Sequence, residues 1–272
     1  MSDTHEKPFN IAMRDIQVPT DRSGEKVVVE DSPRRVRVVF NGETVAASSR
    51  MKLVHETGHL PVYYFPRDDV RMDLMEPAAR VVTNPTRGDA THRTIKVNGR
   101  AAEDAMWSHE TSAVPGLAGL VAFRWEALDH WYEEDEEVFV HARDPYHRVD
   151  TVPSSRRVQV VLAGEIVSDT TRPHFLYETR LPTRYYIPTE DVRADVLVPS
   201  ALETACPYKG TARYYSVALA GEVFEDIIWT YPDPIPECSK IKGLLCFFNE
   251  RVEAILVDGE EIPKTRTPWS QD

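Results

Sequence analysis

A chain of 272 residues is long enough for one large domain or for two domains of ordinary size. Hydrophobic residues make up 42% and charged residues 28%, as in globular proteins, and no apolar run approaches the roughly 18 residues of a membrane-spanning helix. The formal net charge of −12 argues against a nucleic-acid partner, because phosphates require a basic face.

Residues 1–30 are a polar lead-in without the apolar core of a secretory signal. The three cysteines, Cys206, Cys238 and Cys246, are odd in number and form no Cys-x-x-Cys pair. Such a set is typical of reduced thiols rather than of a disulfide framework or a zinc site. We therefore expect a cytoplasmic protein that holds neither a metal nor a cofactor.

The predicted elements of the first half are short strands separated by turn signals. Residues 36–40 form a β-branched run that meets the Asn-Gly pair at 41–42, which is typical of a tight hairpin, and a second strand is expected over 44–47. Residues 66–75 begin with proline followed by acids, which predicts a short helix. Another Asn-Gly pair at 98–99 predicts a further hairpin.

The second half repeats the first at a constant spacing of 122 residues. The run Arg34-Arg-Val-Arg-Val-Val returns as Arg156-Arg-Val-Gln-Val-Val. Other repeated positions are Glu56 and Glu178, Tyr63-Tyr64 and Tyr185-Tyr186, Asp69 and Asp191, Gly88 and Gly210, and Trp107 and Trp229. Fixed spacing indicates an internal duplication, so we predict two units, residues 31–150 and 151–272, joined near 148–155.

Each predicted unit contains many short strands with turn signals and one short helix. This pattern favours a mainly β fold, built either as a small barrel or as a folded sheet. The second unit repeats the helix start at 188–193 and carries Gly-bearing turns at 163–164, 220–221 and 258–259.

Several motifs of the chain resemble one known family. The runs Cys206-Pro-Tyr-Lys-Gly210 and Asp144-Pro-Tyr-His-Arg-Val-Asp150, with the repeated Glu-Thr…Tyr-Tyr-x-Pro-x-x-Asp-Val-Arg pattern, are similar to those of the bacterial and fungal domain of unknown function 427. The resemblance covers residues 33–268 and implies a β-tent-like fold in each unit, the class that includes the thalidomide-binding domain of cereblon. Many β-tent relatives hold zinc on paired Cys-x-x-Cys motifs, which this sequence lacks, so the resemblance implies no metal.

The segment Cys206-Pro-Tyr-Lys-Gly210 differs informatively from its counterpart, Asn84-Pro-Thr-Arg-Gly88. The proline, a basic residue and the glycine are retained, which indicates an architectural turn, whereas the thiol and the phenol occur only in the second unit. A lysine close to Cys206 is the kind of neighbour that favours a thiolate. The cysteine is therefore either a buried, inert residue or one that contacts a ligand or acts as a nucleophile.

Glu178 and its counterpart Glu56 interrupt strands of apolar and aromatic residues. Each is either the ion-pair partner of a framework arginine or a pocket acid. The arginines available for that pairing are Arg50, Arg71, Arg172 and Arg193. A carboxylate desolvated among tyrosines would have a raised pKa and serve as a general acid or base.

The candidate site residues are drawn from these motifs. Adjacent tyrosines place one ring on each face of a strand, so one is expected in the core and the other in a cavity. The candidate catalytic residues are Glu178, Lys209, Tyr208 and Cys206. The candidate ligand-binding residues are Tyr186, Arg193, Tyr214, Trp229 and Tyr231, with Glu56 and Tyr64 in the first unit.

Three functions stay open on the sequence. The first is a small-molecule-binding protein whose polar and aromatic pocket is stronger in the second unit. The second is a lyase, isomerase or hydrolase that uses Glu178 as a base, with Lys209 or Tyr208 stabilising an anion. The third is a protein-interaction scaffold. We expect neither a nucleic-acid nor a membrane partner, and either a monomer with pseudo-two-fold repeats or a homodimer.

Overall fold

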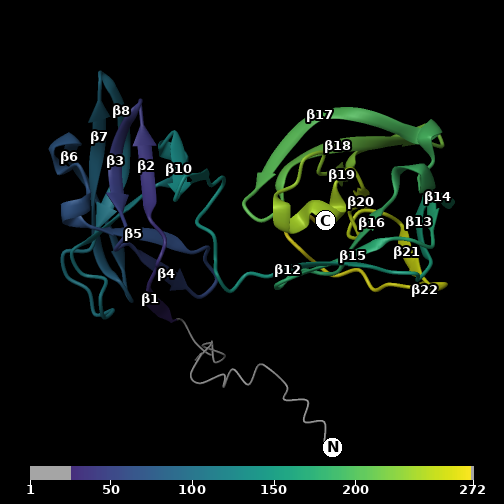
Figure 1. The fold of residues 1–272 in the computed structure, drawn as a ribbon, viewed down its shortest axis with the longest axis horizontal. Coiled ribbons are helices and arrows are strands. Elements are labelled where there is room, and N and C mark those ends of the chain that lie inside the picture. Colours follow the sequence, from purple (N-terminus) through teal and green to yellow (C-terminus); the bar gives the residue numbers. More distant parts are fainter. Residues whose placement is uncertain (1–25, 271–272) are drawn as a thin grey trace, which may run out of the picture.

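The computed structural model describes residues 26–270 as two mainly β units in tandem, which lie side by side (Figure 1). Of the lead-in predicted over 1–30, residues 1–25 lie outside the described range. From Val27 onward the chain already forms strand β1 (Val27–Asp31), which pairs with β4 (Lys52–Glu56). The first unit therefore begins within the segment expected to be a lead-in.

The first unit contains two antiparallel sheets. The larger has the strand order β1-β4-β5-β9-β8-β7-β6, in which the strands after β4 are Val62–Pro66, Leu120–Phe123, Arg100–Ser108, Gly88–Val97 and Met75–Asn84. The smaller has the order β11-β10-β2-β3, formed by Glu136–Glu137, His130–Glu133, Val36–Phe40 and Glu43–Ser48.

The second unit repeats this topology strand for strand. Its larger sheet has the order β12-β15-β16-β20-β19-β18-β17, formed by Val149–Pro153, His174–Glu178, Arg184–Ile187, Leu245–Phe247, Glu222–Thr230, Gly210–Leu219 and Leu197–Cys206. Its smaller sheet has the order β14-β13-β21-β22, formed by Glu165–Thr170, Val158–Leu162, Ala254–Val257 and Glu260–Glu261. The boundary expected between residues 150 and 151 falls inside β12, which pairs with β15 of the second unit.

The expectation of two mainly β units is confirmed, and of the two architectures considered the structure has the open, folded one. Within residues 26–270 neither unit closes its strands into a barrel. The same part of the chain holds no helix whose length and apolar character suit it to crossing a membrane.

The short helix predicted over 66–75 is divided into two 3₁₀ turns, η1 (Arg67–Asp69) and η2 (Met72–Leu74). Val70, between them, is extended with φ −116° and forms a β-bridge with Ala46. That bridge interrupts the helical run. The second unit repeats the arrangement with η4 (Thr189–Asp191) and η5 (Ala194–Val196).

The predicted hairpin turns are confirmed by their backbone angles. Asn41 and Gly42 have φ values of 47° and 81°, and Asn98 and Gly99 have 47° and 81°. Both central residues of such a turn need positive φ, which asparagine and glycine adopt readily. At the equivalent turn of the second unit, Ala163 takes φ 48° without that advantage.

Each unit buries apolar side chains on both faces of its larger sheet. The main core lies between the two sheets and includes Tyr63 in the first unit and Tyr185 in the second. A smaller cluster on the opposite face contains Tyr64 and Tyr186. The predicted division of each tyrosine pair between two faces is confirmed, and the smaller clusters are the ones that border cavities.

Candidate functional site

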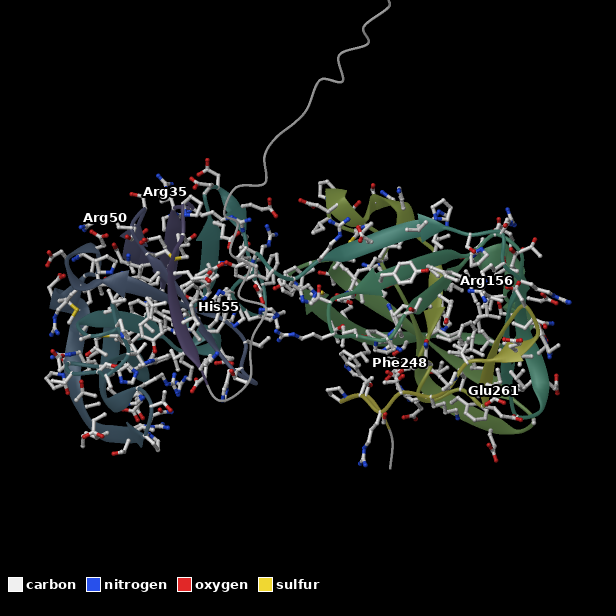
Figure 2. The ribbon with its side chains drawn as sticks, turned by 90° about the horizontal axis from the view of Figure 1, so that it is seen from below. Arg35, Arg50, His55, Arg156, Phe248 and Glu261 are labelled. Carbon is white, nitrogen blue, oxygen red and sulfur yellow. The ribbon has the colours of Figure 1, made fainter. Side chains whose placement is uncertain are left out.

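A cavity of about 530 Å³ lies in the second unit, at its border with the first. This volume falls within the range of roughly 300–1,000 Å³ that is usual for small-molecule sites. Strands β15 to β19 of the larger sheet each supply lining residues, and Phe248, which follows β20, adds a further aromatic ring inside the second unit (Figure 2). Outside the second unit, the cavity is lined by His59, Leu60, Pro61, Val140, His141, Asp144 and His147.

Strand alternation explains which side chains face this cavity. Leu176 and Glu178, two residues apart on β15, both line it, whereas Tyr177 between them is 47% exposed on the other face. Arg184 and Tyr186 line it from β16 by the same rule.

Glu178 is the acid at the centre of the polar part of the cavity. Its side chain is 6% exposed, and its two oxygens accept hydrogen bonds from His147 Nε2 at 2.9 Å and from Lys209 Nζ at 2.5 Å. Burial by itself would raise the pKa of Glu178. The hydrogen bond from His147 and the Lys209 ammonium outweigh that effect and hold the pKa below its ordinary value of 4.5. The raised pKa considered from the sequence is therefore wrong.

The arginines considered as partners of Glu178 pair elsewhere. Arg172 contacts Asp191 at 3.1 Å, and Arg50 contacts Asp69 at 2.6 Å. Arg71 pairs with Asp73 at 2.7 Å, two residues along the chain. An ion pair does hold Glu178, but its cation is the lysine of the Cys-Pro-Tyr-Lys-Gly bend.

Arg193 does not line the cavity, contrary to its expected role as a ligand-binding residue. Its guanidinium lies at the surface, where it contacts Glu165 at 2.5 Å and Asp195 at 2.8 Å. Arg193 lies two residues after the end of η4, and Val192 between them packs in the main core.

The aromatic part of the cavity presents two buried phenols. Trp229 Nε1 donates a hydrogen bond to the Tyr186 hydroxyl at 2.9 Å, so the hydrogen of that hydroxyl stays unpaired. Tyr231 is 5% exposed, and within residues 26–270 its hydroxyl has no hydrogen-bond partner. Burial raises the pKa of both tyrosines well above 10, so both remain protonated donors. Tyr214 and Trp229 add further ring surface.

The bend at Cys206–Gly210 is tied to the segment that connects the units. The Tyr208 hydroxyl accepts a hydrogen bond from the Asp144 amide at 2.7 Å, and its ring stacks on His147 with centroids 4.0 Å apart. Burial raises the pKa of Tyr208 to about 12. Cys206 is half-buried at the cavity wall, while the Lys209 ammonium is turned toward Glu178.

Several lining residues were not predicted from the sequence. His147 is not among the candidate residues drawn from the sequence, yet it contacts Glu178 directly. Arg184 forms a bidentate, buried ion pair with Glu250, with both contacts at 2.7 Å, and lies 5.4 Å from the centre of the Trp229 ring. One signal was present: Arg184 replaces Val62 of the first unit, the same kind of departure that singles out Cys206.

The two predicted residues of the first unit also border a cavity. Glu56 and Tyr64 line a hollow of about 460 Å³ together with Arg87, whose guanidinium is 3.4 Å from Glu56. Trp107 donates to Tyr64 at 2.9 Å, as Trp229 does to Tyr186. The first unit thus retains the acid, the cation and the indole–phenol pair. Among residues 26–270, no group of three or more His, Cys, Asp or Glu side chains is placed to hold a metal ion.

The repeated fold agrees with the comparison with known families. The model of a family described as a domain of unknown function (DUF427) matches residues 28–134 and again residues 150–258. Because these two matches cover most of the chain, the chain belongs to this family, as a tandem member. No curated protein matches the chain.

Proposed function

We propose that the chain binds a small, uncharged, ring-bearing molecule with an acceptor oxygen in the cavity of the second unit. The observation that carries this proposal is a pair of hydroxyls on the buried, cavity-lining side chains of Tyr186 and Tyr231, which have hydrogens to donate and no acceptor within residues 26–270. A carbonyl oxygen of a ligand would accept a hydrogen bond from such a hydroxyl, a contact that contributes about 0.5–1.5 kcal/mol.

The charged groups of the cavity favour a neutral ligand. Glu178 is paired with Lys209, and Arg184 is paired with Glu250. The two other charged residues that line the cavity, Asp144 and Arg180, are of opposite sign, so the wall carries no clear excess of either charge. Much of the remaining wall is apolar, and the rings of Tyr214, Trp229 and Phe248 within it offer faces and edges on which a planar ring can stack.

Binding is favoured over acid–base catalysis by the state of Glu178. Its pKa is lowered, and both of its oxygens already accept hydrogen bonds, which makes it a weak base at neutral pH. In this proposal Glu178 has a positioning role: its two hydrogen bonds hold Lys209 and His147 in place at the cavity wall. An interaction scaffold would give no reason for two unpaired hydroxyls in an aromatic cavity.

The test is a thermal-shift screen followed by calorimetry on the whole chain. The panel contains neutral cyclic carbonyl compounds, including nucleosides and lactams, with matched analogues that lack the carbonyl and others that carry a carboxylate. Neutral carbonyl compounds should raise the melting temperature most. For a compound that binds, Tyr231→Phe should weaken affinity about tenfold by removing one donor.

The matched control is Tyr177→Phe, because this hydroxyl lies on the outer face of β15. It should leave affinity unchanged. No shift with any member of the panel, or equal affinity in Tyr231→Phe and the parent chain, would rule out the proposed site.

A further inference from the structure

The first unit holds a third cavity, of about 310 Å³, at the position that corresponds to the aromatic cavity of the second unit. His92, Trp107 and His109 line it where the second unit has Tyr214, Trp229 and Tyr231. The indole is retained, but both phenols are replaced by imidazoles.

Further differences add positive charge to the first unit's cavity. Arg87 stands in place of Lys209, and Arg124 stands in place of Phe248 after the two-residue slip of the repeat. Arg80 also lines this cavity. Three arginines therefore line this cavity, whereas the corresponding positions of the second unit hold one cation, Lys209.

Several buried nitrogen atoms around this cavity lack partners. His109 is 1% exposed, and within the described part of the chain neither of its ring nitrogens has a hydrogen-bond partner. The same holds for Nδ1 of His92 and Nε of Arg87. Burial, followed by the nearby Arg87 guanidinium, lowers the pKa of His109, so at neutral pH it is an uncharged imidazole with one N–H to donate.

Nearby carboxylates offset this positive charge only in part. Glu56 lies 3.4 Å from Arg87, and Asp104 lies 3.9 Å from Arg80. The Arg124 guanidinium donates to the backbone carbonyl of Glu103 at 3.0 Å, which leaves its charge unneutralised. A basic hollow on a chain with a net charge of −12 is a local feature and not a consequence of overall composition.

We propose that this cavity binds the phosphate group of a small molecule. Planar guanidiniums donate paired hydrogen bonds that match phosphate oxygens. The imidazoles of His92 and His109, which also line the cavity, supply further donors. Three arginines approaching from separate strands and loops suit the three terminal oxygens of a phosphate monoester better than the two of a carboxylate. Trp107 offers a ring face for the organic part of the ligand. This proposal does not depend on the ligand of the second unit.

The experiment is calorimetry on the whole chain with inorganic phosphate, phenyl phosphate, benzoate and benzyl alcohol. We expect both phosphates to bind, phenyl phosphate more tightly, and the other two to bind weakly or not at all. Equal affinity for the two phosphates would indicate free phosphate as the ligand. Absence of binding by either phosphate at millimolar concentration would overturn the proposal.

Variants that introduce the second unit's residues locate the site. Arg124→Phe should weaken phenyl phosphate binding about tenfold, and addition of Arg80→Leu should weaken it further. Arg157→Leu is the matched control, since this exposed arginine pairs with Asp169 in the second unit. Tyr231→Phe should also have no effect, which separates this site from the one proposed above. Unchanged affinity in the folded double variant would contradict the proposal.

Discussion

Trp229 and Tyr186 form a hydrogen-bonded, edge-on pair: the indole N–H lies 2.9 Å from the hydroxyl, and the ring planes are 87° apart. Trp107 and Tyr64 repeat it in the first unit, with the same 2.9 Å distance and a ring angle of 86°. The pair is present in both units although the residues around it change. We therefore assign it a structural role: the indole N–H orients the hydroxyl of the neighbouring tyrosine in each unit.

Replacement of Trp229 with phenylalanine should remove this hydrogen bond and part of the aromatic packing. Because the Tyr186 hydroxyl stays buried, we expect the free energy of unfolding to fall by about 2–4 kcal/mol. Urea denaturation measures the loss. Trp107→Phe should cost less, since Trp107 is only half-buried. An equal or larger loss for Trp107→Phe would contradict this assignment.

Glu178→Gln should be strongly destabilising, because it leaves the buried Lys209 ammonium without its counter-charge. Removal of one member of a buried pair costs about 3–5 kcal/mol. Adding Lys209→Met should recover part of that loss. Glu56→Gln is the matched change in the first unit, where the pair is longer and more exposed, and should cost about 1 kcal/mol. Chemical denaturation of these variants and of Lys209→Met alone measures the losses. Additive single and double losses would show that the pair does not interact.

Acid should weaken the second unit through Glu178. Its pKa in the folded chain lies below the ordinary 4.5 of an unfolded chain, so its contribution to stability is complete above that pH. As pH falls through the folded-state pKa, the carboxylate is protonated and the contribution is lost. Melting temperatures measured from pH 7 to pH 3 should therefore fall less steeply for Glu178→Gln than for the parent chain. Parallel curves would exclude this source of acid sensitivity.

The three cysteines should differ in reactivity. Burial raises the pKa of Cys238 to about 11 and that of Cys246 to about 12, so both stay protonated and shielded. Cys206 is less buried and lines the cavity. Native labelling with iodoacetamide at pH 8, followed by mass spectrometry, should modify Cys206 first. Early labelling of Cys246 would mean that the smaller apolar cluster around Tyr186 opens to solvent. Cys206→Ser is the control, because it should abolish the first modification.

Features that depend on neighbouring residues were predictable from the sequence. The Asn41-Gly42 hairpin is set by two backbone conformations, and the separation of Tyr63 from Tyr64 follows from strand alternation. The duplication was visible because its spacing is constant. The continuous helix predicted over 66–75 is wrong because Val70 forms a β-bridge with Ala46 of β3. That strand lies more than twenty residues earlier, so the local sequence pattern does not reveal the contact.

The contacts of the site were less predictable because they join distant segments. Glu178 meets its partners 31 residues away in both directions along the chain, and Arg184 meets Glu250 at a separation of 66 residues. Many arginines were compatible with Glu178 on charge alone, and only the fold selects the lysine. Differences between the copies would have been the better guide, since they mark Cys206, Tyr208 and Arg184.

The loop His59-Leu60-Pro61 belongs to one copy but closes a wall of the cavity in the other. Hence the ancestral single unit, or a half-length chain expressed alone, would present this hollow with one side missing. Joining the two copies in one chain therefore also made them unequal, because a loop of the first forms part of the binding cavity of the second.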